Sequence, residues 1–272
     1  MVAVARAPRG AFVLIGFMGA GKSTVAAELA EALGVAPRDS DELLEARLGR
    51  SLADAFDDEG GFRAEEEELV CELLAHATPG AVISLGGGSV LSERVREALK
   101  EHVVVLLDVD AEEAWSRVRA QDGGAERPLA RDRERFLALH AERLALYGSL
   151  ADAHLPALAP GAVRATFSAL RALALAPAGT RLVWAASASG DYPVLIRRGL
   201  LSRAGLEELS RAAGLDGSRA FCVSDETVAE LYARRLDVAG MLALAPGERS
   251  KTLASAESVW EALLDAGITR SD

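Results

Sequence analysis

The chain has 272 residues and a formal net charge of −11; half of its residues are hydrophobic and 26% are charged. The length favours two domains, and the acidic balance argues against a nucleic-acid-binding protein, which usually carries a basic face. No apolar run reaches the roughly 20 residues of a membrane-spanning helix, and the N-terminus lacks the apolar core of a signal peptide. We therefore expect a cytoplasmic protein. Its two cysteines, Cys71 and Cys222, form neither a disulfide framework nor a zinc site, and we expect both thiols to be buried.

The first half of the chain alternates strand and helix patterns. Short apolar runs at residues 11–16, 81–86 and 102–109 are bounded by glycine or charge. Such continuous runs predict strands that are buried on both faces of a parallel sheet. The stretches between them predict helices over 22–33, 41–48, 62–76, 92–100, 111–120 and 131–147. This alternation indicates an α/β domain of three layers.

The second half begins with one more predicted helix at residues 162–175, followed by "APAGT", which is typical of a linker. After this linker the strand–helix pattern restarts, with helices predicted over 202–213, 226–235 and 255–266. We therefore expect a first domain at 1–176 and a second, smaller α/β unit at 177–272.

The most specific motif lies between the first strand and the first helix. Gly16 to Ser23, "GFMGAGKS", fits the pattern G-x-x-x-x-G-K-[ST]. In this pattern backbone N–H groups cradle phosphates, the lysine reaches the β- and γ-phosphates, and the hydroxyl binds Mg²⁺. The sequence therefore predicts a nucleoside triphosphate–Mg²⁺ site with Lys22 and Ser23 in these roles. The loop alone does not decide the class of enzyme, although the absence of an Asn-Lys-x-Asp run argues against a GTPase.

Two carboxylates, Asp39 and Asp41, follow the position expected for the second strand. Side chains separated by one residue point the same way along an extended strand. One carboxylate could hold magnesium through water, and the other could accept the proton of an attacking hydroxyl. An equally good interpretation is that Asp39 or Ser40 caps the following helix.

Three arginines and a glycine run complete the set of candidate residues. Arg63 could bind a substrate carboxylate in a bidentate manner, or it could pair with neighbouring glutamates. Three glycines, 86–88, exceed what a turn needs and indicate close approach of the backbone to a ligand. Arg127 lies in a glycine-rich stretch that could close over the nucleotide as a lid. Arg143, taken alone, is typical of a surface helix.

Together these motifs resemble those of shikimate kinases, and they occur in the same order. The resemblance covers about residues 8–175 and rests on Gly16–Thr24, Asp39–Asp41, Phe62-Arg63, Gly86–Gly88, Arg127–Leu129, and Glu142-Arg143 through Tyr147 to Asp152. It implies a P-loop fold of the nucleoside-monophosphate-kinase type with a five-stranded parallel sheet. It also implies a monomeric kinase domain that transfers the γ-phosphoryl group of ATP to the 3-hydroxyl of shikimate, in aromatic amino-acid biosynthesis.

The resemblance assigns the nucleotide side of the site as follows. The phosphates would be cradled by Gly19, Ala20, Gly21, Lys22, Ser23 and Thr24. Ser23 would bind Mg²⁺, with Asp39 behind a water molecule. Arg127, on the lid, would neutralise charge on the phosphates, and Arg119 would lie against the adenine.

On the acceptor side, the resemblance implies that Arg63 and Arg143 clamp the shikimate carboxylate and that the backbone of Gly87 approaches the ring. Asp41 would contact the ring hydroxyls and orient or deprotonate the nucleophile, so Asp41, Lys22 and Arg127 are the expected catalytic residues. One departure concerns "AFDDEGGFR", which is about two residues shorter than the family pattern. Gly61 stands where a glutamate that can help to hold the substrate is usual, so the departure leaves the expected fold intact and the affinity for substrate open.

Another small-molecule P-loop kinase, of the gluconate or nucleotide kinase type, remains an alternative interpretation. Such an enzyme would share the fold and the phosphate loop. It would have no need for Asp41, Arg63 and Arg143 together.

The second segment resembles the opening of 3-dehydroquinate synthase, through "YPVLIRRGLL", "FCVSDETVAELY" and "LAPGERSKTLASAESVWEALLDAGITRSD". That family uses NAD and a divalent metal, and the resemblance places Asp225, Glu248 and Lys251 on the adenosine side of NAD. "SDET" is equally typical of a plain helix N-cap.

The dinucleotide-binding glycines and the metal ligands of that synthase family do not occur in this sequence. The resemblance therefore implies an incomplete, Rossmann-like unit from a bifunctional fusion or a truncated frame. Such a unit would be inactive alone and would bind NAD only if complete. Its last helix should then expose Val259, Leu263 and Ile268.

Overall fold

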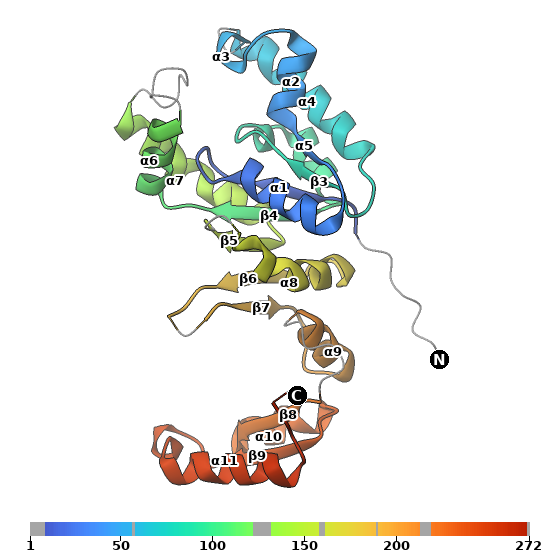
Figure 1. Ribbon diagram of the computed structural model, residues 1–272, viewed down its shortest axis with the longest axis vertical. Helices are drawn as coiled ribbons and strands as arrows, with labels where there is room; N and C mark the ends of the chain where they lie inside the picture. Colours follow the sequence, from blue (N-terminus) through green and yellow to red (C-terminus); the bar gives the residue numbers. More distant parts are fainter. Residues whose placement is uncertain are drawn as a thin grey trace. The chain divides into compact units, whose positions relative to one another are not determined.

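The structure is a computed structural model that describes residues 9–55, 58–121, 132–157, 161–188, 190–212 and 219–270. Residue contacts divide the chain into two compact units, Met1–Val194 and Leu195–Asp272. Figure 1 labels the helices and strands of both units.

The first unit is built on a seven-stranded sheet with the strand order β2-β3-β1-β4-β5-β6-β7. Parallel pairing joins β1 to both β3 and β4, and also joins β2 to β3, β4 to β5 and β5 to β6. The strands are β1 Phe12–Ile15, β2 Pro37–Asp39, β3 Val82–Ser84, β4 Val103–Asp108, β5 Ala153–Pro156, β6 Arg181–Ala185 and β7 Tyr192–Ile196. The expected α/β fold with a mostly parallel sheet is confirmed.

Helices connect these strands and cover the sheet. They are α1 Lys22–Leu33, α2 Ser40–Leu48, α3 Leu52–Ala55, α4 Glu59–Ala75, α5 Glu93–Leu99, α6 Ala111–Gln121, α7 Arg133–Leu150 and α8 Val163–Leu175, with a short 3₁₀ turn, η1, at Ser89–Leu91. In the described part of the chain α1 packs against α8, and α6 packs against α7 (Figure 1). The four residues of β1 are at most 4% exposed, as the apolar run predicted.

The sheet is longer than the five strands expected. β6 follows the predicted linker, yet it pairs with β5 through Leu182 with Ala153 and Val183 with His154. Leu182 and Trp184 are buried while Val183 is exposed, so alternate residues of β6 contribute to the core of the first unit. The compact units consequently divide at residue 194 rather than at the boundary of 176 that composition suggested.

His102 lies directly before β4, at the amino-terminal end of the sheet. Its Nδ1 accepts a hydrogen bond from the backbone N–H of Ala11 at 3.0 Å, and the residue is 6% exposed. A side chain at Gly10 would overlap this nitrogen. Burial lowers the pKa of His102 below its usual value, so the neutral ring is the form that fits.

The first prediction concerns the pH dependence of stability. Because the folded-state pKa of His102 lies below the unfolded value of about 6.5, the unfolded state binds more protons. Stability is therefore complete above about pH 6.5 and is lost as the pH falls below it. We expect a loss of about 1 kcal/mol, or roughly 2–4 °C in Tm, measured by thermal unfolding.

Two asparagine variants test this prediction. His102→Asn keeps an acceptor but cannot take up a proton, so its Tm should change less between pH 7 and about pH 5.5. The control is His76→Asn, which makes the same substitution at an exposed histidine that caps the end of α4. If Tm changed with pH to the same extent in the parent chain and in both variants, His102 would not be the cause of the loss of stability at low pH.

The second unit contains a two-stranded parallel sheet of β8 Phe221–Asp225 and β9 Gly240–Leu244. Its helices are α9 Arg203–Ala212, α10 Glu226–Tyr232 and α11 Leu253–Asp265, with 3₁₀ turns η3 at Ala233–Arg235 and η4 at Glu248–Ser250. No residue of β8, β9 or α11 is buried. Parallel sheets are usually buried on both faces, and the sheet of this unit is not.

The exposed side of α11 differs from the expectation. Val259, Leu263 and Ile268 are half-buried, because α11 packs against β9. The large apolar side chains that α11 exposes are instead Leu253, Trp260 and Leu264, at 88%, 63% and 75% exposure. The last helix thus presents apolar surface, but on a neighbouring face, about 100° around the helix from Val259 and Leu263.

The two thiols are free and half-buried rather than buried. Cys222 lies on β8, none of whose residues is buried. Cys71 lies on α4, and partial burial raises the pKa of its thiol. Among the described residues, no helix is both long and apolar enough to span a membrane.

Candidate active site

The phosphate loop lies between β1 and α1, as predicted. Gly19 and Gly21 have φ values of +79° and +85°, which only glycine adopts without strain. Gly21 caps α1 with no side chain bonded to the first turn, so the helix N-terminus can offer N–H groups to an anion. Lys22 folds back over the loop, and its Nζ donates to the carbonyls of Gly16 at 3.0 Å and Phe17 at 3.2 Å.

Asp39 joins the phosphate loop to α2. Its Oδ2 accepts a hydrogen bond from the Ser23 hydroxyl at 2.7 Å, and its Oδ1 accepts one from the backbone N–H of Asp41 at 2.9 Å. The capping interpretation of Asp39 is therefore confirmed. The same carboxylate also reaches the serine of the loop, so the cap does not exclude a second role.

The glycine run after β3 lies where several site residues meet. The N–H of Gly86 donates to Ser40 Oγ at 2.9 Å, and a side chain at Gly86 would overlap the Asp41 carboxylate. A side chain at Gly87 would come within 3.5 Å of the carbonyl of Gly16 in the phosphate loop. The run thus brings the Asp41 carboxylate and the phosphate loop together.

Arg63 is held by a buried carboxylate. Its Nη1 donates to Glu66 Oε2 at 2.6 Å, and Glu66 Oε1 accepts a hydrogen bond from Ser89 Oγ at 2.8 Å. Glu66 is 5% exposed, so this ion pair fixes the guanidinium one turn into α4. The pairing interpretation of Arg63 is confirmed. The side chain is still 26% accessible, and it lies directly against Gly88.

Arg143 and Tyr147 approach the same glycines from α7. Tyr147 donates its hydroxyl to the carbonyl of Gly87 at 2.7 Å, and Arg143 Nη1 lies 3.4 Å from that oxygen. Arg143 is 8% exposed, so its interpretation as a surface arginine is wrong. The i, i+4 spacing places both side chains on the buried face of α7. Burial raises the pKa of Tyr147, which keeps its hydroxyl protonated as a donor.

Gly88→Ala is expected to raise the KM for the phosphoryl acceptor about tenfold. The added methyl group would overlap the Arg63 guanidinium and displace it from the position set by Glu66. Steady-state kinetics with each substrate varied in turn measures the effect. Gly60→Ala is the matched control, because its Cβ would meet no atom closer than 3.9 Å. An unchanged acceptor KM in Gly88→Ala would show that the position of Arg63 is not limiting.

Two further residues were expected at the nucleotide site. Arg127 lies outside the described residues. Arg119 is exposed on α6, with its guanidinium 5.8 Å from the ring centroid of Trp115. The sequence interpretation also missed Glu66 and Arg117, although the spacings Arg63–Glu66 and Glu113–Arg117 are typical of helical ion pairs.

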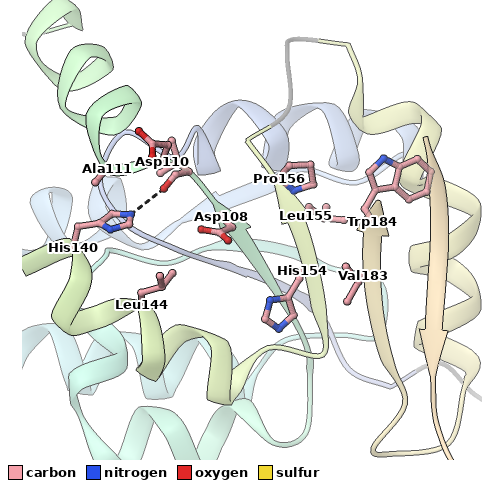
Figure 2. Close-up of a pocket in the computed structure, with 11 residues that line it drawn as sticks. Asp108, Asp110, Ala111, His140, Leu144, His154, Leu155, Pro156, Val183 and Trp184 are labelled. Carbon is pink, nitrogen blue, oxygen red and sulfur yellow. Dashed lines mark hydrogen bonds between the residues drawn. The ribbon is translucent and has the colours of Figure 1, made fainter. Parts of the chain in front are cut away.

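A hollow of about 520 Å³ lies at the carboxyl ends of β4 and β5. Figure 2 shows His140 and Leu144 from α7 on one side, and Leu155 and Trp184 on the other. His140 Nε2 lies 2.9 Å from the carbonyl of Val109, so this nitrogen carries the proton and donates. None of the predicted site residues lines this hollow. Within the described ranges, no cluster of three or more acidic, His or Cys side chains could hold a metal ion.

Comparison with known proteins identifies one family over the first unit. The family model "Shikimate kinase" matches residues 18–159. The shikimate kinase of Thermobifida fusca (strain YX) is 47% identical over 141 residues, which are 51% of this chain and 80% of that protein. The shikimate kinase of Mycobacterium avium (strain 104) is 48% identical over 140 residues, which are 50% and 77% of the two chains.

A solved structure of the Acinetobacter baumannii shikimate kinase in complex with shikimate is 33% identical to this chain, with a TM-score of 0.51. The match covers 57% of this chain and 87% of the other. With the phosphate loop in place and the family model matching more than half of its residues, the chain is a kinase and belongs to the shikimate kinase family.

Proposed function

We propose that the chain transfers the γ-phosphoryl group of ATP to the 3-hydroxyl of shikimate, in the biosynthesis of aromatic amino acids. The observation that carries this proposal is the meeting of Asp41, Arg63 and Arg143 around the glycine run 86–88, beside the phosphate loop. A carboxylate and two guanidiniums suit a small acid with several hydroxyls. We further propose that the kinase unit acts as a monomer in the cytoplasm.

On the donor side, the N–H groups of Gly19 to Thr24 and the Lys22 ammonium would hold the phosphates. The paired oxygens of Ser23 and Asp39, 2.7 Å apart, fit Mg²⁺, which prefers oxygen ligands and keeps several waters. Ser23 would bind the ion directly, and Asp39 would bind it through water. Bound Mg²⁺ supplies neutralisation of the phosphate charge. We assign Arg127 to the phosphates and Arg119 to the adenine.

On the acceptor side, Arg63 and Arg143 would bind the carboxylate, and the backbone of Gly87 would approach the ring. Asp41 would orient the 3-hydroxyl and take its proton as the phosphoryl group transfers. Phosphoryl transfer needs positioning and charge neutralisation more than covalent help, and these groups supply both.

Gly61 has a structural reason in this chain. Asp58 caps α4 by accepting a hydrogen bond from the N–H of Gly61 at 3.1 Å, and a side chain at Gly61 would overlap that carboxylate. In the shortened segment, residue 61 thus has no side chain, and this leaves room for Asp58 to cap α4. We propose that acceptor binding relies here on the buried Glu66 that holds Arg63.

The test incubates the purified chain with ATP, MgCl₂ and shikimate, and measures ADP release together with phosphorylated shikimate by mass spectrometry. Gluconate and nucleoside monophosphates serve as competing acceptors. We expect the highest kcat/KM with shikimate. Faster turnover of gluconate or a nucleotide would favour the other P-loop kinase types, and no ADP release from a folded protein would overturn the proposal.

We also propose that residues 177–272 are the opening part of a 3-dehydroquinate synthase-like domain that is inactive alone. Its β8 and β9 are parallel, so their carboxyl ends meet at one edge, which is where open α/β sheets bind ligands. Asp225 ends β8 and caps α10 through the N–H of Val228 at 2.9 Å. Glu248 and Lys251 follow β9 and form an ion pair at 2.7 Å. These are the three residues we assign to the adenosine side of NAD.

Calorimetry with NAD tests the second assignment. Because the dinucleotide-binding glycines and metal ligands are absent from the sequence, we expect neither synthase activity nor tight NAD binding by this chain. Tight binding that Asp225→Ala abolishes would show a working NAD site and would contradict inactivity of the segment. The kinase assay is unaffected by either outcome.

A further inference from the structure

Helix α6 lies directly against the phosphate loop. A Cβ at Gly19 would come within 2.7 Å of the carbonyl oxygen of Ala114 and 3.0 Å of the Val118 side chain. Ala114 and Val118 are at most 1% exposed. The loop and this face of α6 are therefore packed without space between them, so a side chain on the same face can act on the loop.

Arg117 lies on that face of α6, between Ala114 and Val118. Its Nη1 is 3.4 Å from the carbonyl oxygen of Gly19, and its Nη2 donates to Glu113 Oε1 at 2.6 Å. The same Nη1 is 3.9 Å from the position that a Cβ of Gly21 would take. One nitrogen of the guanidinium thus faces a glutamate, and the other faces the phosphate loop.

We propose that Arg117 is a positioning residue that sets the phosphate loop for nucleotide binding; this inference rests on the nucleotide site proposed above. In a trans peptide the C=O and the following N–H point in opposite directions. Drawing the Gly19 carbonyl toward α6 therefore turns the Ala20 N–H into the loop. There the Ala20 N–H donates a hydrogen bond to the carbonyl of Phe17, with 3.3 Å between N and O, and the same carbonyl accepts a hydrogen bond from Lys22.

Glu113 has a supporting role in this arrangement. An i, i+4 ion pair near the surface contributes little to stability. The stability of α6 therefore does not explain the Glu113–Arg117 pair. Its geometric effect is to fix the direction of the guanidinium, because one edge of the fork is held while the other reaches Gly19. A hydrogen bond to the carbonyl also polarises the peptide and makes its N–H a better donor.

The experiment measures the Kd of ATP and of ADP by calorimetry in the absence of shikimate, and then the KM for each substrate and kcat. Arg117→Ala should weaken nucleotide binding about tenfold and leave the KM for shikimate within about twofold. Arg117→Lys keeps the charge but not the fork, so it should recover only part of the loss. Glu113→Gln should have a smaller effect than Arg117→Ala.

Arg133→Ala is the matched control. Arg133 forms an exposed ion pair with Glu112, the neighbour of Glu113, so its loss should leave nucleotide affinity unchanged. Unchanged nucleotide affinity in Arg117→Ala would overturn the proposal. The proposal would also be overturned if Arg117→Ala weakened the binding of nucleotide and of shikimate to the same extent and lowered Tm as well, because general destabilisation would then explain the result. A wild-type chain that binds ATP but does not phosphorylate shikimate would contradict the proposed function and leave the role of Arg117 measurable.

Discussion

Replacing Lys22 with alanine is expected to lower kcat at least about 10³-fold, because charge on the transferring phosphoryl group would lose its ammonium partner. The structure holds Lys22 beside the place where phosphates would lie, through Nζ contacts to Gly16 and Phe17. These carbonyls remain after the substitution, so the loop loses the charge and keeps its glycine geometry. The size of the effect follows from the transition state, which a protein stabilises mainly by positioned charge.

Single-turnover kinetics with saturating ATP separates this loss from weaker nucleotide binding. Lys100→Ala is the control, because Lys100 pairs with Glu97 in an exposed position after α5 and should leave kcat unchanged. The melting temperature of both variants should stay near that of the parent chain. A kcat within tenfold of the parent value in Lys22→Ala would contradict the assignment of the loop as the phosphate site.

The sequence predicted the phosphate loop well because its signal is contiguous. Glycines with positive φ, a lysine and a hydroxyl occur within eight residues, between a strand and a helix. The residues that identify the loop therefore lie together in the sequence, although α6 also packs against the loop. The same holds for Asp39, whose capping role follows from its place before α2.

Residues whose roles depend on distant partners were harder to predict. The sequence around Arg143 is typical of a surface helix. Arg143 is nevertheless buried, because Gly87, which follows β3, lies beside α7. Glu66 lies in a run of glutamates, and only its contacts with Arg63 and Ser89 distinguish it from the others. Arg117 was overlooked for the same reason, since its partner Gly19 is 98 residues away.

Two differences between pattern and structure in the second half have a related cause. Composition placed a boundary before β6, but strand pairing with β5 decides which sheet a strand joins. On α11, helical periodicity identifies one apolar face, while packing against β9 selects which side is covered. Pattern predicts the elements, and only tertiary contacts decide their neighbours.

Asp41→Asn is expected to lower kcat by about 10²-fold or more, which is typical of the loss of a general base. Asparagine has nearly the same shape and retains the backbone N–H that donates to Asp39, so the start of α2 and the Ser23–Asp39 contact should persist. Glu42→Gln, one residue along in the first turn of the same helix, is the matched control and should have no effect on kcat.

Whether Asp41→Asn changes kcat or the KM for shikimate identifies the role of the carboxylate. If Asp41 takes the proton, kcat falls while the KM for shikimate changes little. If Asp41 only binds ring hydroxyls, the KM rises and kcat stays near normal, which would remove the base role. Asp41 is exposed, but it lies so close to Gly86 that a side chain there would overlap its carboxylate. The carboxylate therefore lies beside the glycine run and the proposed acceptor site, and this is why we expect the loss in kcat.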